Sequence, residues 1–398
     1  MMIIDSHLDL SWNALNWKRD LTESIEEIRR SEEGTNDRRR GHNTVSFPEL
    51  QKAGVAACLA TVLARSSQLK DPLLDYPSRE IASAMGLGQV EYYRIMESQG
   101  RMRMIRDWPA LESHVAEWKR AGGNGTPLGY ILAMEGADPI LEPSQVELWW
   151  ERGLRVVEPA HFGVSYYAHG TGAPGGLTSK GRELLAAMEA VGMILDITHL
   201  ADESFWQALE IYGGPVLASH HNCRALVPGD RQLTDEQIRA LVERDAVIGA
   251  VFDSWMLYPN YVAGETDNSL VSVERVIDHI DHVCQLAGNT RHSAIGSDLD
   301  GGFGTEQSPR ELNTIADLQS FPDLLRKRGY KETDIEGIMH GNWLRFFQKA
   351  WAKPQHADTP GIDLPSPLGG EGEPQGGGRG GQHQDDRPES SLYPAPRS

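Results

Sequence analysis

The stretch "GMILDITHLADESFWQALEIYGGPVLASHH", residues 192–221, holds two short apolar runs separated by a helical pattern. The runs, at residues 192–199 and 215–221, have the length and apolar character of buried strands. Between them, residues 202–212 place apolar side chains at the spacing of an amphipathic helix. A strand, a helix and a second strand in this order predict two parallel strands joined by a helical crossover.

The same alternation of apolar runs and helical stretches continues along most of the chain. Six further runs read as strands, at residues 1–5, 54–64, 128–136, 154–161, 246–252 and 292–301. Helical patterns lie between such runs at residues 179–191, 233–244 and 272–288. Eight buried parallel strands with helices on both faces predict an α/β fold, the (β/α)8 TIM barrel. An open doubly wound sheet is the alternative, but no glycine-rich dinucleotide motif follows any run.

Other segments extend this barrel. Residues 20–52 are charged and helix-like, so we expect a solvated insertion there, and residues 77–120 add further helix. Thr234 and Gln237 match the capping box that begins a helix. Residues 353–398 are rich in Gly, Pro and polar residues and cannot bury enough apolar surface to offset the entropy of ordering. We therefore expect a barrel domain over residues 1–352, followed by a disordered tail.

The composition restricts the partners and the compartment. The formal net charge of -19 makes nucleic acid an unfavourable partner, because an acidic surface repels phosphates. The three cysteines are far apart and form neither a disulfide framework nor a zinc-finger pattern. We find no apolar stretch long enough to cross a membrane and no secretory signal pattern. The cytoplasm is therefore the expected compartment.

Polar residues gather at the ends of the predicted strands. Six of the eight runs end in, or are followed directly by, a histidine or a carboxylate: His7 and Asp9, Glu135, His161, His199, His220, and Asp298. In barrels of this kind the carboxyl ends of the strands meet at one rim, where active sites lie. Imidazoles and carboxylates without thiolates suit zinc or a similar divalent ion. Four such ligands and one bridging carboxylate are enough to hold two ions, which together can activate water as a nucleophile.

Six ordered motifs make the chain resemble the membrane (renal) dipeptidase family of the metal-dependent amidohydrolase superfamily. They read "DSHLDL", "AMEGADPI", "DITHLAD", "PVLASHHNCRAL", "DRQLTDEQIRAL" and "IGSDLDG", and the resemblance covers roughly residues 2–350. It implies a binuclear zinc site, with other divalent ions as alternatives. One ion would be held by His7, Asp9 and Glu135. Glu135 would bridge to a second ion held by His199 and His220.

The resemblance also implies three residues that act on the substrate. His161 would bind the substrate carbonyl and its oxyanion. Arg231 would hold the C-terminal carboxylate of the substrate, which a guanidinium can bond through two parallel donors. Asp298 would move the proton from the attacking water to the leaving amine. Departures from the family pattern, Ala160 in place of Thr and Gln232 in place of Asn, affect the expected substrate preference and leave the expected metal ligands unchanged.

The predicted function is therefore a zinc-dependent dipeptidase. A C-terminal D-residue in the substrate is a hypothesis for this chain, and members of the family are often dimers, so a homodimer is one expectation. Two alternatives stay open. The first is another amidohydrolase-type reaction, on N-acyl amino acids, lactones or phosphoesters. The second is a metal-binding barrel without activity.

Overall fold

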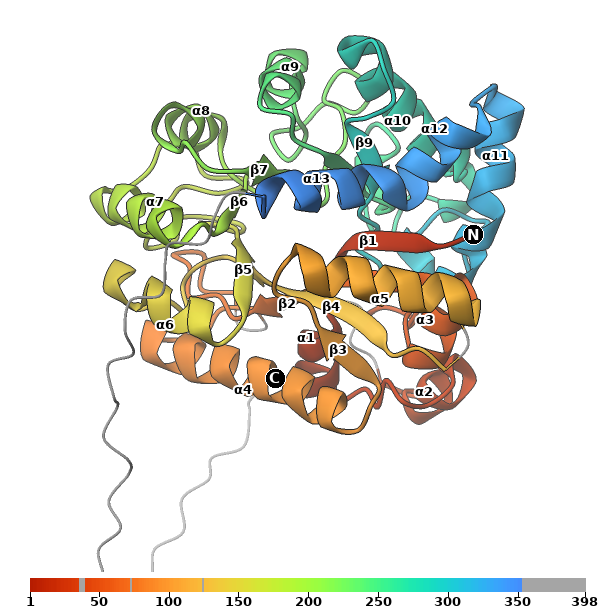
Figure 1. Ribbon diagram of the computed structural model, residues 1–398, viewed down its shortest axis with the longest axis horizontal. Coiled ribbons are helices and arrows are strands. Elements are labelled where there is room, and N and C mark those ends of the chain that lie inside the picture. The colour runs from red at the N-terminus through yellow and green to blue at the C-terminus, as the bar shows by residue number, and fades with distance from the viewer. Residues whose placement is uncertain (36–39, 72–73, 124, 353–398) are drawn as a thin grey trace, which may run out of the picture. The chain divides into compact units, whose positions relative to one another are not determined.

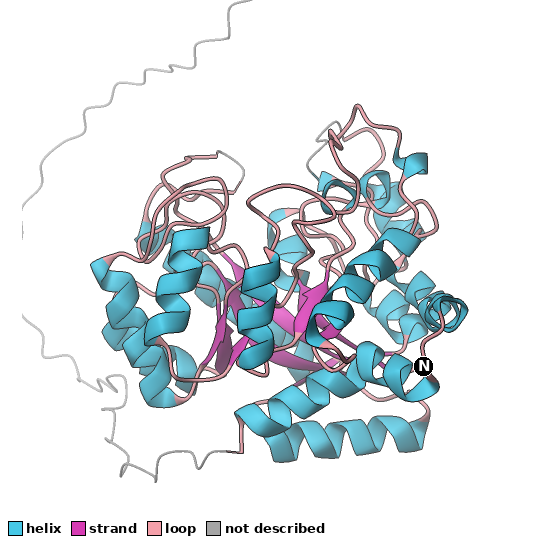
Figure 2. Cartoon of the chain, turned by 90° about the horizontal axis from the view of Figure 1, so that it is seen from above, coloured by secondary structure: helices cyan, strands magenta, loops and turns pink. Residues whose placement is uncertain are grey.

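The computed structural model describes residues 1–35, 40–71, 74–123 and 125–352, and the fold is reported for these residues. Strands occupy the centre and helices surround them (Figures 1 and 2). None of the described helices is long and apolar enough to cross a membrane. The tail expected at residues 353–398 lies outside the described residues.

Eight parallel strands form the central ring. They are β1 (Ile3–Leu8), β2 (Val55–Leu63), β4 (Leu128–Glu135), β5 (Leu154–Val157), β6 (Ile194–Asp196), β7 (Val216–Leu217), β8 (Ile248–Ala250) and β9 (Ser293–Ile295). One sheet runs in the order β1-β2-β4-β5-β6-β7, and β8 pairs with β9. Each predicted apolar run therefore contains or overlaps one of these strands, with β1 extending past its predicted run to Leu8, and the predicted α/β barrel is confirmed.

Hydrogen bonds join the two sheets into a ring. Between β7 and β8, Gly249 N donates to Ala218 O over 2.8 Å. Between β9 and β1, the Ser6 hydroxyl donates to Ile295 O over 3.1 Å, and Ser297 N donates to the Asp5 carboxylate over 2.9 Å. The junction between β9 and β1 is therefore made by side chains of β1, whereas the other junctions are made by hydrogen bonds between backbone groups.

Two apolar layers follow from the alternation of side chains along each strand. Residues of one parity fill the ring: Ile4, Leu59, Ile131, Ala133, Val156, Ile194, Leu217 and Ala294. Residues of the other parity, such as Leu132 on β4, pack outward against the helices. Trp343 of α13 (Asn342–Ala350) joins the inner layer, and its indole N–H donates to Ile295 O. The ring is thus a packed core, closed by α13 at the end where the strands begin.

The helices cover the outer face of the ring (Figure 2). They are α1 (Leu10–Asn16), α2 (Ile25–Ser31), α3 (Phe47–Ala53), α4 (Arg79–Ser98), α5 (Trp108–Ala121), α6 (Val146–Glu151), α7 (Ser179–Val191), α8 (Asp202–Ile211), α9 (Asp235–Glu243), α10 (Glu274–Ala287), α11 (Phe321–Arg328), α12 (Glu332–Glu336) and α13. The predicted helices at 179–191, 202–212, 233–244 and 272–288 match α7 to α10. The predicted capping box is present, since Thr234 and Gln237 bond each other's backbone N–H groups.

Residues 77–120 contain the predicted further helix, as α4 and α5, and also a strand that was not predicted. Met102–Met104 forms a short strand, β3, which pairs in parallel with β4 between Leu128 and Tyr130. β5 pairs with β4 only from Leu132 onward, so the edge of residues 128–130 on that side is free to accept a further strand. The predicted run 154–161 is also shorter as a strand and ends at Val157. The residues after it turn into the rim of the barrel, where the candidate site lies.

Candidate metal centre

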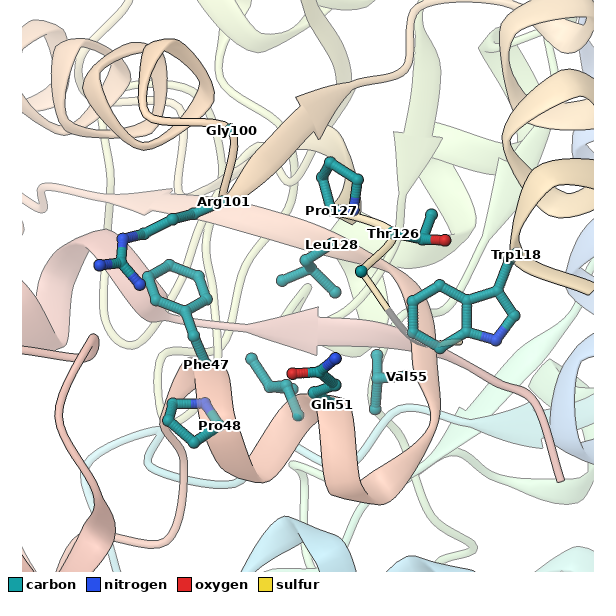
Figure 3. Close-up of a pocket in the computed structure, with 12 residues that line it drawn as sticks. Phe47, Pro48, Gln51, Val55, Gly100, Arg101, Trp118, Thr126, Pro127 and Leu128 are labelled. Atoms are coloured by element: carbon teal, nitrogen blue, oxygen red, sulfur yellow. The ribbon is translucent and has the colours of Figure 1, made fainter. Parts of the chain in front are cut away.

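Two cavities lie at opposite ends of the strands. One lies where β2 and β4 begin, between Phe47, Arg101 and Trp118 (Figure 3), and none of its described lining residues is a histidine or a carboxylate. The other, of about 170 Å³, lies where the strands end. Five predicted site residues line it together with Arg231: Asp9, Glu135, His161, His199 and Asp298. His7 and His220 lie buried beneath these residues. The polar strand ends therefore meet in one place, as predicted.

One group of possible ligands surrounds the end of β1. His7 Nε2 lies 3.7 Å from each of three carboxylate oxygens, on Asp9, Glu135 and Asp298. His7 Nε2 and Glu135 Oε2 are buried and have no hydrogen-bond partner. Buried polar atoms without partners are unfavourable unless an ion or water occupies the space between them. Asp9 is held in place because its other oxygen accepts a hydrogen bond from the Thr61 hydroxyl.

A second group faces the other oxygen of Glu135. Glu135 Oε1 lies 3.4 Å from His199 Nε2 and 3.5 Å from His220 Nε2. The two imidazole nitrogens are 3.2 Å apart. Two histidines on one tetrahedral zinc, with Zn–N bonds of about 2.05 Å, place their nitrogens about 3.3 Å apart. The observed spacing fits two ligands of one ion, and Glu135 presents one oxygen to each group.

Hydroxyl groups behind these two histidines orient their rings. His199 Nδ1 lies 3.1 Å from the Thr171 hydroxyl, and Thr171 in turn donates to His199 O. His220 Nδ1 lies 2.9 Å from the Ser219 hydroxyl, which donates to Glu158 over 3.3 Å. Each hydroxyl has a second acceptor in reach for its own hydrogen, so each is able to accept from Nδ1–H. The Nε2 lone pairs are then directed into the centre, as metal ligands require.

The electrostatics of the centre favour a bound cation. Burial and the negative charge of Asp9 raise the pKa of Glu135, and burial raises the pKa of Asp298 well above its ordinary value. Burial lowers the pKa of His199 and His220 well below the usual value, which keeps both rings neutral. Neutral imidazoles beside carboxylates that repel one another form a donor set that a divalent ion would stabilise.

His7 differs from the other two ring ligands in its charge environment. Burial alone lowers its pKa, but the Glu135 and Asp9 carboxylates outweigh that effect and raise the pKa well above its ordinary value. A cation placed between His7 and these carboxylates would take over the role of the proton. Proton and metal would therefore compete for this group, and metal binding there would release a proton.

The residues predicted to act on substrate line the same cavity. Arg231 is 2% exposed and donates from Nη2 to His220 O over 3.0 Å, while its Nη1 lies against the ring of His221. His161 places Nε2 3.4 Å from Glu135 Oε1. Apolar side chains form the remaining wall: Trp12, Leu63, Leu74, Phe162, Trp255 and Met256. The cavity thus combines charged groups at its base with apolar sides, which suits a small zwitterion with side chains.

Two residues of the centre have a strained backbone. His199 has φ 63° and Asp298 has φ 59°, both in the left-handed region that L-residues rarely adopt. Such a conformation costs on the order of 1–3 kcal/mol and is retained mainly at functional sites. Both side chains line the cavity at the ends of the strands. No pattern in the sequence indicates these two conformations.

The sequence interpretation left out residues that complete the centre. Glu158 follows β5 directly and is 2% exposed, and its carboxylate lies within 4.8 Å of ligand atoms of His7, Glu135 and His220. Its place directly after a strand is the same signal that identified Glu135, so it could have been found. Thr171 carries no such signal, because it reaches His199 from a loop 28 residues earlier in the chain. Ser219 directly precedes His220, and a lone serine beside a histidine does not indicate such a contact.

The chain is similar to one protein family over nearly all of its length. The profile of the membrane dipeptidase family, peptidase family M19, matches residues 1–359. An uncharacterised protein from the pqqA 5′ region of Klebsiella pneumoniae is 29% identical over 233 residues, which cover 56% of this chain and 83% of that protein. Dipeptidase aclJ of Aspergillus oryzae is 31% identical over 224 residues, covering 54% of this chain and 50% of that protein. The match to the Aspergillus relative thus spans about half of its length.

A solved structure is similar in fold. It is a metallopeptidase from Rhodobacter sphaeroides, liganded with a phosphinate mimic of the dipeptide L-Ala-D-Ala. The TM-score is 0.71 at 23% identity, and the superposition covers 88% of this chain and 99% of that chain. At this level of identity the likeness concerns the fold, and it agrees with the closed barrel described above.

Proposed function

Since this chain belongs to the membrane dipeptidase family, peptidase family M19, we propose that it is a metal-dependent dipeptidase with a binuclear zinc site. The observation that carries the proposal is the position of Glu135, whose two oxygens face two separate groups of possible ligands. The first ion would be held by His7, Asp9 and Glu135, and the second by Glu135, His199 and His220. Zinc suits this set because it consists of imidazoles and carboxylates without thiolates.

The side chains around the proposed ions would bind the substrate, stabilise the developing charge and transfer the proton. A pair of divalent ions supplies an acidic water as nucleophile and polarises the scissile carbonyl. Arg231 would bind the free carboxylate of the substrate, and His161 would donate from Nε2 to the carbonyl oxygen as negative charge develops there. Asp298 would accept the proton of the nucleophile at a carboxylate oxygen and return it to the leaving amine. Its raised pKa supports this role, because a carboxylate with a raised pKa is a stronger base toward the proton of the nucleophile than an ordinary aspartate.

The proposed substrates are dipeptides, including those with a C-terminal D-residue. The cavity is small, at about 170 Å³, and closed by apolar side chains, which favours a short peptide over a long one. The ligand of the Rhodobacter structure, a mimic of L-Ala-D-Ala, supports the D-residue in the second position. Arg231 supports a free carboxylate at the end of the substrate, because a buried guanidinium without an anionic partner is unfavourable.

A substrate panel with a matched variant tests this function. Zinc-loaded protein would be incubated with L-L and L-D dipeptides, the corresponding dipeptide amides, N-acetyl amino acids, a lactone and a phosphoester. We expect dipeptides to be hydrolysed and the amides, which lack the carboxylate, to be poor substrates. Arg231→Met should raise KM for the dipeptides by about 10–100-fold, the loss of one hydrogen-bonded charge pair, and change KM for the amides little.

The panel also separates the alternatives. Turnover of N-acetyl amino acids, lactone or phosphoester without turnover of dipeptides would assign a different amidohydrolase reaction. Absence of any turnover by protein with two bound ions would refute the enzymatic proposal. An equal effect of Arg231→Met on dipeptides and their amides would show that Arg231 does not read the carboxylate.

A further inference from the structure

A buried arginine contacts the ring of His161 from behind. Arg65, in the segment after β2, is 2% exposed, and its Nη1 lies 3.0 Å from His161 Nδ1. A guanidinium has only N–H donors and keeps its proton in proteins. In this contact Nδ1 must therefore be the acceptor, with its lone pair toward Arg65. A neutral imidazole carries a single N–H, so the hydrogen of His161 lies on Nε2, at the side of the cavity.

Arg65 is itself held in one orientation. Its Nε and Nη2 donate to the two oxygens of Asp75, over 2.6 and 3.1 Å, in a bidentate pair. Asp75 also accepts backbone N–H bonds from Ser67 and Asp71, over 2.9 and 2.6 Å. Burial alone would raise the pKa of Asp75, but Arg65 and these bonds lower it, so the carboxylate stays charged. Because the guanidinium is planar and its other two nitrogens bond Asp75, Nη1 is directed at His161 and at no other acceptor among the described residues.

Comparison with the two predicted histidine ligands shows why this matters. His199 and His220 each face a hydroxyl at Nδ1, which accepts a hydrogen and leaves Nε2 as a lone pair. His161 faces a donor at the same atom, so its Nε2 carries the hydrogen. By distance alone His161 could join Glu135 and His199 as a third set of ligands. The partner at Nδ1 therefore decides between a metal ligand and a hydrogen-bond donor.

We propose that Arg65, anchored by Asp75, is a positioning residue that keeps His161 in the Nε2–H tautomer, so that His161 donates to the substrate carbonyl and does not bind metal. The catalytic part of this inference rests on the proposed dipeptidase function. The tautomer itself is a property of the protein and can be measured without substrate.

The experiment uses full-length protein labelled with 15N-histidine and loaded with zinc. Long-range 15N–1H spectra report which ring nitrogen carries hydrogen, and loss of signals in His161→Gln identifies His161 among the 14 histidines. The main variant is Arg65→Met with Asp75→Asn, which removes the donor without leaving a buried carboxylate unpaired. Arg65→Lys keeps a donor and a charge, while Arg345→Met with Asp245→Asn removes a partly exposed arginine–aspartate pair elsewhere in the molecule.

We expect wild type to show hydrogen on Nε2 and a lone pair on Nδ1. In the main variant we expect loss of this pattern and a fall in kcat of about 100-fold, the effect of losing one oxyanion donor, with a KM change of no more than about threefold. Arg65→Lys should restore the Nε2–H pattern and bring kcat within about tenfold of wild type. The Arg345 control should leave the tautomer and kcat unchanged, and zinc content should be the same throughout.

Two results would overturn the inference. One is hydrogen on Nδ1 of His161 in wild type, and the other is an unchanged Nε2–H pattern in the main variant. If no dipeptide is hydrolysed by wild type, the proposed function fails, but the spectra still decide whether Arg65 sets the tautomer. A fall in kcat that follows zinc content, with the tautomer preserved, would assign Arg65 a structural role only and refute the proposal.

Discussion

The role of each ionisable residue in this centre depends on a few atoms around it. His7, His161, His199 and His220 lie in or beside the same cavity, and their second ring nitrogens face different partners, which would give identical rings different tasks. The hydroxyls of Thr171 and Ser219 accept from the predicted ligands His199 and His220, whereas the guanidinium of Arg65 donates to His161. His7 Nε2 lies 3.7 Å from the carboxylates of Asp9, Glu135 and Asp298. Residue type alone therefore identifies the candidates but not their tasks.

Asp253 provides a test at this scale that does not involve the metal ligands. It lines the cavity, accepts hydrogen bonds from Trp255 N and the Gln307 side chain, and burial raises its pKa to about 7. The folded protein thus binds this proton more tightly than the unfolded chain does, and its stability falls as pH rises from about 4 to 7. Asp253→Asn removes that dependence. We expect the variant to gain free energy of unfolding relative to wild type over this interval, with no further gain above it.

Urea unfolding of metal-free protein at a series of pH values measures this difference. Glu265→Gln, at an exposed carboxylate, is the control and should show no comparable trend. A stability difference between Asp253→Asn and wild type that is the same at pH 4 and pH 8 would contradict the prediction.

The strands place these residues at one rim, and the packing of the helices against the rim segments leaves little room for additional side-chain atoms. The strands are short, only two or three residues from β6 to β9, so the segments that follow them carry much of the rim. The helices outside hold these segments by close backbone contacts. One such contact is at Gly181 in the first turn of α7, where a Cβ atom would lie 1.9 Å from Tyr167 O in the loop that follows His161.

Two helical glycines test the packing of these elements against each other. Gly181→Ala in α7 should destabilise the protein by about 1–3 kcal/mol, because the new methyl group overlaps a backbone oxygen that must move. Gly88→Ala in α4 meets open space, and should stabilise by up to about 1 kcal/mol through helix propensity. Chemical unfolding of both variants measures the two effects. Shifts in the same direction would contradict the packing described here.

At the scale of the whole molecule, the metal centre connects parts of the ring that are far apart in the chain. His7, Glu135, His199 and His220 come from β1, β4 and the ends of β6 and β7, and the ring closes between β9 and β1 through side chains of Asp5 and Ser6. An ion held by several of these strands binds the folded state only. Bound metal should therefore stabilise the whole barrel.

Removal of metal tests this linkage. Protein treated with a chelator should unfold several degrees lower than protein with two equivalents of zinc, since a ligand at 100 times its Kd contributes about 2.7 kcal/mol. Elemental analysis should give two ions per chain for wild type. Glu135→Gln should bind less metal at both positions and show little change of Tm on addition of zinc. Equal Tm values for wild type with and without zinc would contradict the proposed centre.

Much of this architecture could be predicted because it depends on local patterns. The unit at residues 192–221 predicts β6, α8 and β7, and the structure confirms all three. Apolar periodicity reports burial directly, and parallel strands bring their carboxyl ends to one side. The family resemblance is likewise confirmed by the family profile, which matches residues 1–359. The motifs that carry the resemblance include the strand ends, so they are visible in the sequence. The strand β3 was missed, since three residues carry too little periodicity to be distinguished from a loop.

The sequence by itself therefore determined the fold, the family and the set of residues that gather at the rim. Only the tertiary structure decided how those residues are oriented. The hydroxyl behind His199 and the guanidinium behind His161 come from segments distant in the chain, Thr171 and Arg65. The left-handed backbone of His199 and Asp298 has no signal in the sequence either. The physical reason is that burial follows from a local alternation of side chains, whereas the direction of a hydrogen bond depends on which partner the folded chain brings to each ring nitrogen.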